Sequence, residues 1–247
     1  MAHAIRIGTA AWSIPRTWAD RFPTEGTHLQ RYAARLSAVE INSSFYRPHR
    51  RETYERWAAS VGRDFRFAVK MPRTITHERR LAGVGEALDA FAAQVGGLND
   101  KLGAILIQLP PSLAFVSDTA GAFLAASAAR FAAPIVIEPR HPSWFSNEAD
   151  SLLDAHRVAR VAADPPLMPA AAYPGGWRGF AYVRLHGSPR IYWSDYEEAA
   201  VAAQADAALA LVASAETWII YDNTAAGFAT GNALALEAFV KHDSDMD

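Results

Sequence analysis

Eight short runs rich in β-branched and aromatic residues recur along the chain and alternate with segments of helical pattern. The runs cover residues 5–9, 38–42, 65–70, 103–109, 134–138, 158–164, 180–186 and 217–222. Strands that alternate with helices indicate βαβ units and a parallel sheet. Eight such units close a (β/α)8 barrel, which takes about 250 residues, and this chain has 247. We therefore expect an α/β fold of the (β/α)8 TIM-barrel type, with residues 1–247 as a single domain.

Helical patterns fill the intervals between most of these runs. They cover about 28–37, 51–60, 86–100, 119–131, 147–156, 194–213 and 231–241. The interval 165–179 is rich in proline and glycine instead, which predicts an irregular crossover between the sixth and seventh strands. A doubly wound open sheet is the structural alternative, but neither of its usual glycine-rich phosphate loops occurs in the sequence.

Composition excludes several classes of protein. The chain has no cysteine, which rules out a disulfide scaffold, a thiolate zinc site and a cysteine nucleophile. Its formal net charge of −2 gives no global electrostatic case for nucleic-acid binding. No apolar run approaches the roughly 20 residues that span a bilayer, and the N-terminus lacks the apolar core of a signal peptide. We expect no membrane partner and a cytoplasmic location.

The fifth run leads straight into a group of charged and aromatic residues. Residues 135–137 are β-branched, and Glu138, Arg140, His141 and Trp144 follow them between prolines. This pattern predicts a buried strand that ends in a functional loop. In a (β/α)8 barrel, the C-terminal ends of all strands open into one active-site mouth.

Side chains alternate between the two faces of a strand, so polarity predicts which ones face the lumen. Val39 and Ile41 share one face of the second strand, and Glu40 shares the other with Asn42. Applied to every strand, this rule predicts a polar mouth. Its expected members are Glu40, Asn42, Lys70, Gln108, Glu138, Asp164, Arg184, His186 and Asp222. In the sixth strand the rule assigns Asp164 to the lumen together with Arg160.

Such a mouth suits acid/base chemistry on an anionic ligand that bears phosphate or carboxylate and resembles a sugar or a nucleotide. The catalytic candidates are Glu138, His141, Lys70 and His186. The candidates for substrate binding are Arg140, Arg184, Trp12, Glu40, Asn42, Tyr46, His77, Gln108, Trp144, Asp222 and Asn223. A plainer interpretation takes the aromatic residues as ordinary packing, and Glu138 with Arg140 as a structural ion pair.

Two alternatives stay open. A divalent metal is one, with Glu40, Glu138, Asp164, His186 and Asp222 as ligands in a phosphodiesterase, endonuclease-like or isomerase enzyme. No cofactor is otherwise indicated, and no ligand pair has the local spacing of a known metal motif. The other is a barrel without turnover that binds nucleic acid or a partner. Its contact surface would be the arginines Arg47, Arg50, Arg51, Arg73, Arg79 and Arg80.

Several motifs, taken in order, resemble the YecE-like family, domain of unknown function 72. They are IGT at 7–9 with Trp12, VEINSSFY at 39–46, FAVK at 67–70 with Pro72 and ITH at 75–77, QLPP at 108–111, EPRHPSW at 138–144, YVRLHG at 182–187 and DNT at 222–224. The resemblance implies a (β/α)8-like barrel and no established activity. A likeness of such barrels to endonuclease IV and the sugar isomerases is one of fold alone. Pro139 stands where the resemblance leads us to expect phenylalanine.

Overall fold

The computed structural model describes residues 3–244. The strands are β1 (Ile5–Ala10), β2 (Ala38–Ile41), β3 (Arg66–Lys70), β4 (Leu102–Gln108), β5 (Ile135–Glu138), β6 (Val158–Arg160), β7 (Ala162–Asp164), β8 (Gly175–Gly176), β9 (Phe180–Leu185) and β10 (Glu216–Tyr221). The α-helices are α1 (His28–Ala33), α2 (Ser43–Tyr46), α3 (Arg51–Ala59), α4 (Gly85–Val95), α5 (Ser117–Ala128), α6 (Asn147–Ala155), α7 (Glu198–Val212) and α8 (Phe228–Ser244). Shorter helical turns are η1 (Arg16–Arg21), η2 (Thr74–Glu78), η3 (Gly96–Lys101), η4 (Pro142–Phe145) and η5 (Pro169–Ala172).

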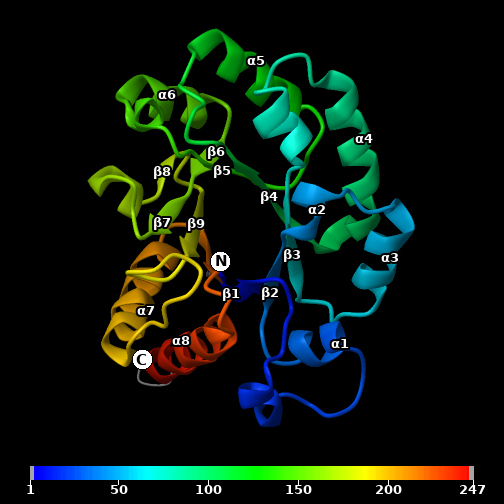
Figure 1. Ribbon diagram of the computed structural model, residues 1–247, viewed down its shortest axis with the longest axis vertical. Coiled ribbons are helices and arrows are strands. Elements are labelled where there is room, and N and C mark those ends of the chain that lie inside the picture. The colour runs from blue at the N-terminus through cyan, green and yellow to red at the C-terminus, as the bar shows by residue number, and fades with distance from the viewer. Residues whose placement is uncertain (1–2, 245–247) are drawn as a thin grey trace.

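The strands form one sheet in the order β7-β9-β10-β1-β2-β3-β4-β5-β6-β8. The sixth predicted strand is split at Val161, so β6 pairs in parallel with β5 while β7 pairs in parallel with β9. The chain itself thus joins the two sides of the sheet, and the helices surround the resulting ring (Figure 1). The predicted TIM-barrel-like fold is confirmed.

The crossover between β7 and β9 is irregular, as predicted. Residues 165–179, all of which the structure describes, form the short turn η5 and the strand β8 but no α-helix. Strand β8 pairs antiparallel with β6. Elsewhere the helices cover the outer face of the sheet, against apolar side chains such as Val39, Ile41 and Leu185. No helix within residues 3–244 is long and apolar enough to cross a membrane.

The side chains that fill the lumen are small on one side of the barrel and large on the other. Strands β1 to β4 contribute the small inward residues Ala10, Ala38, Ala68 and Ala104, whereas β9 and β10 contribute Phe180, Tyr182 and Trp218. Gly103 shows how tight the fit is, because a Cβ there would lie 2.4 Å from Cζ2 of Trp218. Large side chains from one wall thus fill the floor of the barrel and support the polar layer above them.

The polarity rule fails in the sixth strand. Its inward residues are Ala159 and Val161, which belong to the lumen cluster. Arg160 points outward, where its Nε donates a hydrogen bond to Asp150 of α6 at 2.9 Å. Asp164 accepts a hydrogen bond from the hydroxyl of Tyr196 at 2.6 Å, away from the mouth. The expectation that Asp164 lies in the mouth is therefore wrong. The two charged residues of this strand therefore find their partners on the outer side of the barrel, Arg160 on α6 and Asp164 at Tyr196.

Candidate active site at the barrel mouth

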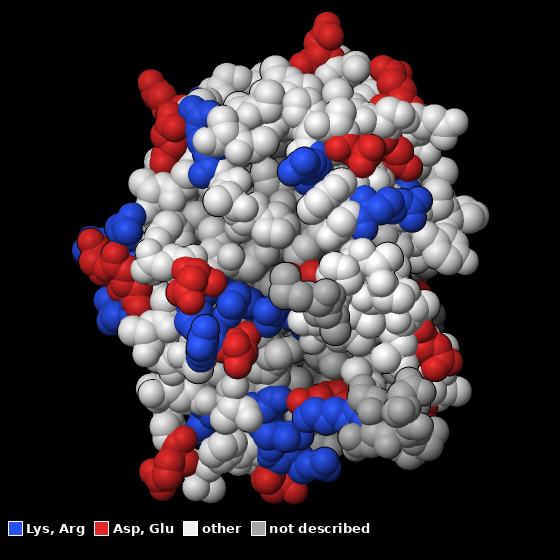
Figure 2. Space-filling view, turned by 180° about the vertical axis from the view of Figure 1, so that it is seen from behind, with Lys and Arg blue, Asp and Glu red and all other residues white. Residues whose placement is uncertain are grey.

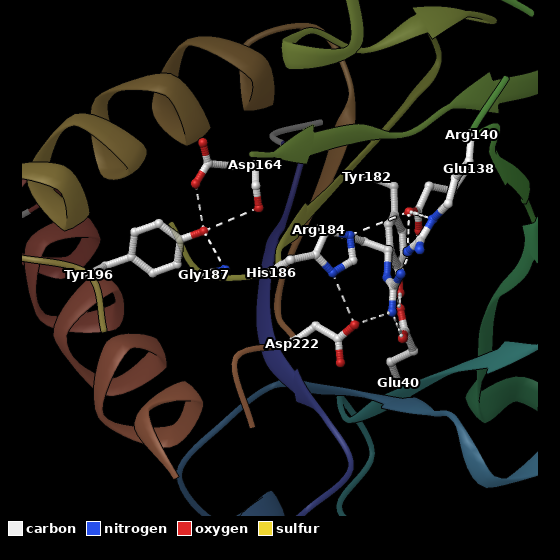
Figure 3. A network of polar contacts seen from close by, with 10 residues as sticks. All are labelled: Glu40, Glu138, Arg140, Asp164, Tyr182, Arg184, His186, Gly187, Tyr196 and Asp222. Carbon is white, nitrogen blue, oxygen red and sulfur yellow. Dashed lines mark hydrogen bonds and ion pairs between the residues drawn. The ribbon is translucent and has the colours of Figure 1, made fainter. Parts of the chain in front are cut away.

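Arg184, near the end of β9, is the centre of a buried polar network (Figure 3). It has no exposed surface. Its Nε and Nη2 donate to the two carboxylate oxygens of Glu40 at 3.0 and 2.7 Å. Nη2 also donates to Asp222 at 2.8 Å, and Nη1 donates to Glu138. Burial would lower the pKa of Arg184, but the three carboxylates raise it well above its ordinary value. Arg184 thus provides a fixed positive charge between three strands.

Both carboxylate oxygens of Glu40 accept hydrogen bonds within this network. Besides its two bonds to Arg184, it accepts a hydrogen bond from the Tyr182 hydroxyl at 2.8 Å. Its side chain has no exposed surface. Glu40 and Arg184 were both expected to bind substrate, yet the structure buries them against each other. Their contribution to a ligand site is therefore indirect, through the placement of Glu138 and Asp222.

Glu138 is held in its ionised form at the end of β5. Arg140 donates to its Oε1 through Nε at 3.0 Å and lies 2.9 Å away through Nη2. Burial alone would raise the pKa of Glu138, but Arg184, His186 and Arg140 hold it well below its usual range. A carboxylate of this kind is a poor proton donor, and it favours positive charge on its neighbours.

His186 lies between two of these carboxylates. Its Nδ1 is 3.1 Å from Asp222 Oδ2, and its Nε2 is 3.4 Å from Glu138 Oε1 without the geometry of a hydrogen bond. Nε2 is buried and has no hydrogen-bond partner in the part of the chain that the structure describes. Burial would lower the pKa of His186, but Glu138 and Asp222 raise it, which favours the imidazolium form. The ring of Tyr192 packs edge-on against the imidazole, with 5.7 Å between the two ring centroids.

Lys70, at the end of β3, is the next cation in the mouth. Its side chain is largely buried, and Nζ lies 4.4 Å from the centroid of the Phe45 ring. Burial, followed by the nearby Arg184, lowers the pKa of Lys70 to about 8, although Glu40, Glu138 and Asp222 act in the opposite direction. His77 is beside it: burial, then Lys70, Arg73 and Arg140, lower the pKa of His77.

A cavity of about 300 Å³ opens beside this network. Glu138, Arg140 and His186 line its polar side, and Leu167 and Ile191 are among the residues on its apolar side. Its volume is at the lower end of the range for small-molecule sites, which begins near 300 Å³. The cavity therefore gives a small ligand access to the imidazole and guanidinium groups.

Three other predicted site residues do not line this cavity. Trp144 is buried and donates its indole N–H to the carbonyl of Leu113 at 2.9 Å. His141 pairs with Ser143 Oγ at 2.8 Å through Nδ1. Asn223 is buried and donates to the Ser194 carbonyl.

The remaining predicted residues lie around the mouth or at its rim. Trp12 packs edge-on against Trp57, and Tyr46 is largely exposed. Gln108 is largely buried at the end of β4. Asn42 has a buried Oδ1 without a partner among the described residues, and it borders a separate cavity of about 220 Å³ with Trp12.

The proposed set of five metal ligands is not brought together. Asp164 lies outside the barrel, and Arg184 occupies the space between Glu40, Glu138 and Asp222 that a cation would need. Within the described residues, no group of three or more acidic or histidine side chains has an arrangement suited to a metal ion.

Sequence reasoning missed Tyr182 and Tyr192. Tyr182 reads as a packing residue, because nothing local reveals that its hydroxyl meets Glu40 across the lumen. Tyr192 adopts a positive φ of 70°, which a sequence does not show for a non-glycine residue, and this brings its ring onto His186. The recurrence of polar residues at strand ends was the only available signal.

Two of the six surface arginines form ion pairs, and two others donate to backbone carbonyls. Arg51 pairs with Glu55 at 2.8 Å and Arg73 with Glu78 at 3.2 Å. Arg80 donates to the carbonyl of Ser112. The face seen in Figure 2 likewise intermingles basic and acidic side chains.

Fold and site together define an α/β barrel with a buried ionic network at the C-terminal mouth. A family model described as "Protein of unknown function DUF72" matches residues 6–246, and the chain belongs to this family. It is 28% identical over 151 residues to the UPF0759 protein YecE of Escherichia coli K12. That match covers 58% of this chain and 50% of YecE, so the chain spans about half the length of the curated relatives it matches.

Solved structures of the same family share the fold. A DUF72 protein from Enterococcus faecalis superposes with a TM-score of 0.80 at 23% identity, covering 96% of both chains. A DUF72 protein from Thermotoga maritima superposes with a TM-score of 0.79 at 23% identity, covering 97% of this chain and all of the other. A dihydrodipicolinate synthase gives 0.51 at 10% identity, covering 99% of this chain and 79% of that one. These likenesses concern the fold alone.

Proposed function

We propose that this protein is an enzyme that uses acid/base chemistry on a small anionic ligand. The ligand carries phosphate or carboxylate on a sugar- or nucleotide-like body and binds in the cavity at the barrel mouth. The observation that carries the proposal is His186 Nε2, which is buried and makes no hydrogen bond in the described part of the chain, on a residue that lines the cavity. A buried nitrogen without a partner is costly, so it favours a ligand that completes its hydrogen bonding.

The roles follow from the electrostatics. His186 is the general acid, because Glu138 and Asp222 favour its protonated form. Arg140 supplies a partly exposed guanidinium at the cavity wall. Lys70 does not line the cavity but adds a second cation to the mouth, which no carboxylate pairs within the described residues. These cations bind the anionic group. Glu138 stays ionised and stabilises the imidazolium.

Calorimetric titration with glucose 6-phosphate, with glucose as the uncharged match, tests binding. We expect glucose 6-phosphate, inorganic phosphate or acetate to bind, with an affinity that falls as the pH rises through the pKa of His186. His186→Gln should remove that decrease, and the decrease near pH 8 that comes from Lys70 should remain. His156→Gln, at the end of α6, is the control and should retain both decreases.

Turnover is tested by proton NMR in deuterated water, with a mixture of sugar phosphates and small carboxylates. The native protein should consume a component or incorporate deuterium into it, and His186→Gln should not. The proposal is wrong if none of the anionic probes binds at millimolar concentration, or if the native protein and His186→Gln leave every component equally unchanged.

A further inference from the structure

Lysine is rare in this chain, and its three copies have different environments. Among 24 basic residues, only Lys70, Lys101 and Lys241 are lysines. Lys101 is tied by its Nζ to the carbonyls of Gly62 and Arg63 at 2.8 and 2.6 Å. Lys241 is exposed and pairs with Glu237 at 3.0 Å. Arginine provides nearly all of the positive charge, so a lysine inside the mouth suggests a requirement that a guanidinium does not meet.

Lys70 has an amine that is free of polar partners. Within residues 3–244 it makes no hydrogen bond and no ion pair, although Glu40, Glu138 and Asp222 are near enough to influence its titration. Its ammonium rests on the face of Phe45 at 4.4 Å. The backbone at this point is fixed, because the Ser44 hydroxyl donates to the Lys70 carbonyl at 2.7 Å. The amine is thus held at a strand end, in the layer where barrel enzymes place reacting groups.

Desolvation beside another cation is the environment that makes a lysine nucleophilic. A pKa of about 8 rather than 10.5 leaves roughly 300 times more neutral amine at pH 7. An arginine has no neutral, nucleophilic form at this pH, because its guanidinium stays protonated. The features on which the inference rests are the free amine, its burial and its fixed position; the lowered pKa supports them.

We propose that Lys70 is a covalent attachment site, whose amine condenses with the carbonyl group of a small aldehyde or ketone that bears a carboxylate or phosphate. The inference rests on the proposed function of the mouth and names the class of its ligand. Arg140 binds the anionic group at the cavity wall, and the ligand extends beyond the cavity, which Lys70 does not line, so that its carbonyl carbon reaches Nζ.

The reaction balances without an added oxidant or reductant. The Nζ lone pair forms a bond to the carbonyl carbon, and the carbonyl oxygen takes a proton from His186 to give a carbinolamine. The neutral imidazole of His186 then takes a proton from the nitrogen and gives it to the hydroxyl, water leaves as the C=N bond forms, and the iminium nitrogen returns its proton to His186. The product is an imine between the ligand and Lys70, with one water released.

Borohydride trapping tests the step, because hydride reduces an imine to a stable secondary amine. The native protein is treated at pH 7 with pyruvate or dihydroxyacetone phosphate, each followed by borohydride, and peptides are mapped by mass spectrometry. Acetone is the uncharged control. We expect adduct on Lys70 at least about tenfold above that on Lys241, with a carboxylate or phosphate probe but not with acetone. Whichever anionic probe reacts identifies the anionic group.

Two variants and a denatured sample serve as controls. Lys70→Arg should lose the adduct, and Lys241→Arg should retain it. Unfolded protein should be modified alike at both sites, because the selectivity comes from the fold. Modification confined to Lys241 and the N-terminal amine would overturn the inference, and equal reaction with acetone would overturn the anionic ligand class. Anion binding dependent on His186 without any Lys70 adduct would reject the imine but leave the proposed function standing.

Discussion

Replacing Arg184 by methionine should destabilise the protein more than any other single change in the mouth. Arg184 has no exposed surface and donates four hydrogen bonds to Glu40, Glu138 and Asp222. Methionine fills a similar volume but leaves three buried carboxylates that lose their shared cation. Breaking a buried ion pair by removing one partner costs about 3–5 kcal/mol. We expect a loss in free energy of unfolding of at least that size at pH 7.

The loss should shrink as the pH falls. In the native protein the pKa of Glu138 and that of Asp222 are lowered, so their stabilising effect is present above the unfolded pKa near 4 and is lost below it. Without Arg184, burial dominates and raises the folded pKa of these groups, so the variant gains stability as it takes up protons at lower pH. The contribution in the native protein is the same at pH 7 and pH 5, so the proton uptake of the variant makes the difference between the two proteins smaller at pH 5 than at pH 7.

Urea unfolding at pH 7 and pH 5, followed by circular dichroism, measures this difference. Arg51→Met is the matched control, because Arg51 pairs with Glu55 on the surface and its loss should cost less than about 1 kcal/mol. A loss below about 1 kcal/mol for Arg184→Met, or one that is equal at both pH values, would refute the electrostatic reasoning.

Two further outcomes follow from the same structure. His186→Gln should flatten the pH dependence of stability: the pKa of His186 is raised, so its contribution is full below about 6.5 and is lost as the pH rises through the folded value. Unfolding at pH 6 and pH 8 measures this, and an equal difference between variant and native protein at both would contradict it. Gly103→Ala should cost about 1–3 kcal/mol because its Cβ would overlap the Trp218 ring, whereas Gly62→Ala, with open space, should cost less than about 0.5 kcal/mol. Thermal unfolding compares the two, and equal stability would show that the lumen is not tightly packed.

The barrel was predictable because its signal is repeated. Eight apolar runs with interleaved helical patterns indicate parallel strands, whatever any single run does. The broken crossover at 165–179 was also predictable, since proline and glycine lower helix propensity directly. The prediction that polar side chains face the lumen failed for Asp164, because it assumes that a helix covers the outer face of every strand. Where that helix is missing, a charged residue can face outward and meet Tyr196.

Strand ends with polar residues predict where the mouth is, but not which residues act there. The sequence predicts Lys70 and His186 as catalytic residues, and Glu40 and Arg184 as residues that bind substrate. In three dimensions Glu40 and Arg184 satisfy each other and are buried. The amine of Lys70 makes no hydrogen bond or ion pair in the described chain, and His186 Nε2 makes no hydrogen bond there. The distinction depends on side chains from different strands meeting across the lumen, which no local pattern encodes.

The charges of the mouth indicate what kind of ligand it can bind. Glu40, Glu138 and Asp222 provide three negative charges, and Arg184 and Arg140 offset two of them. A protonated His186 offsets the third, so the positive charge of Lys70 is left over. A surplus charge in a largely buried site is costly unless a ligand neutralises it or the group loses its proton. An anionic group removes the surplus by binding, and imine formation consumes neutral amine. The lowered pKa of Lys70 and the preference for an anionic carbonyl compound therefore have one physical cause.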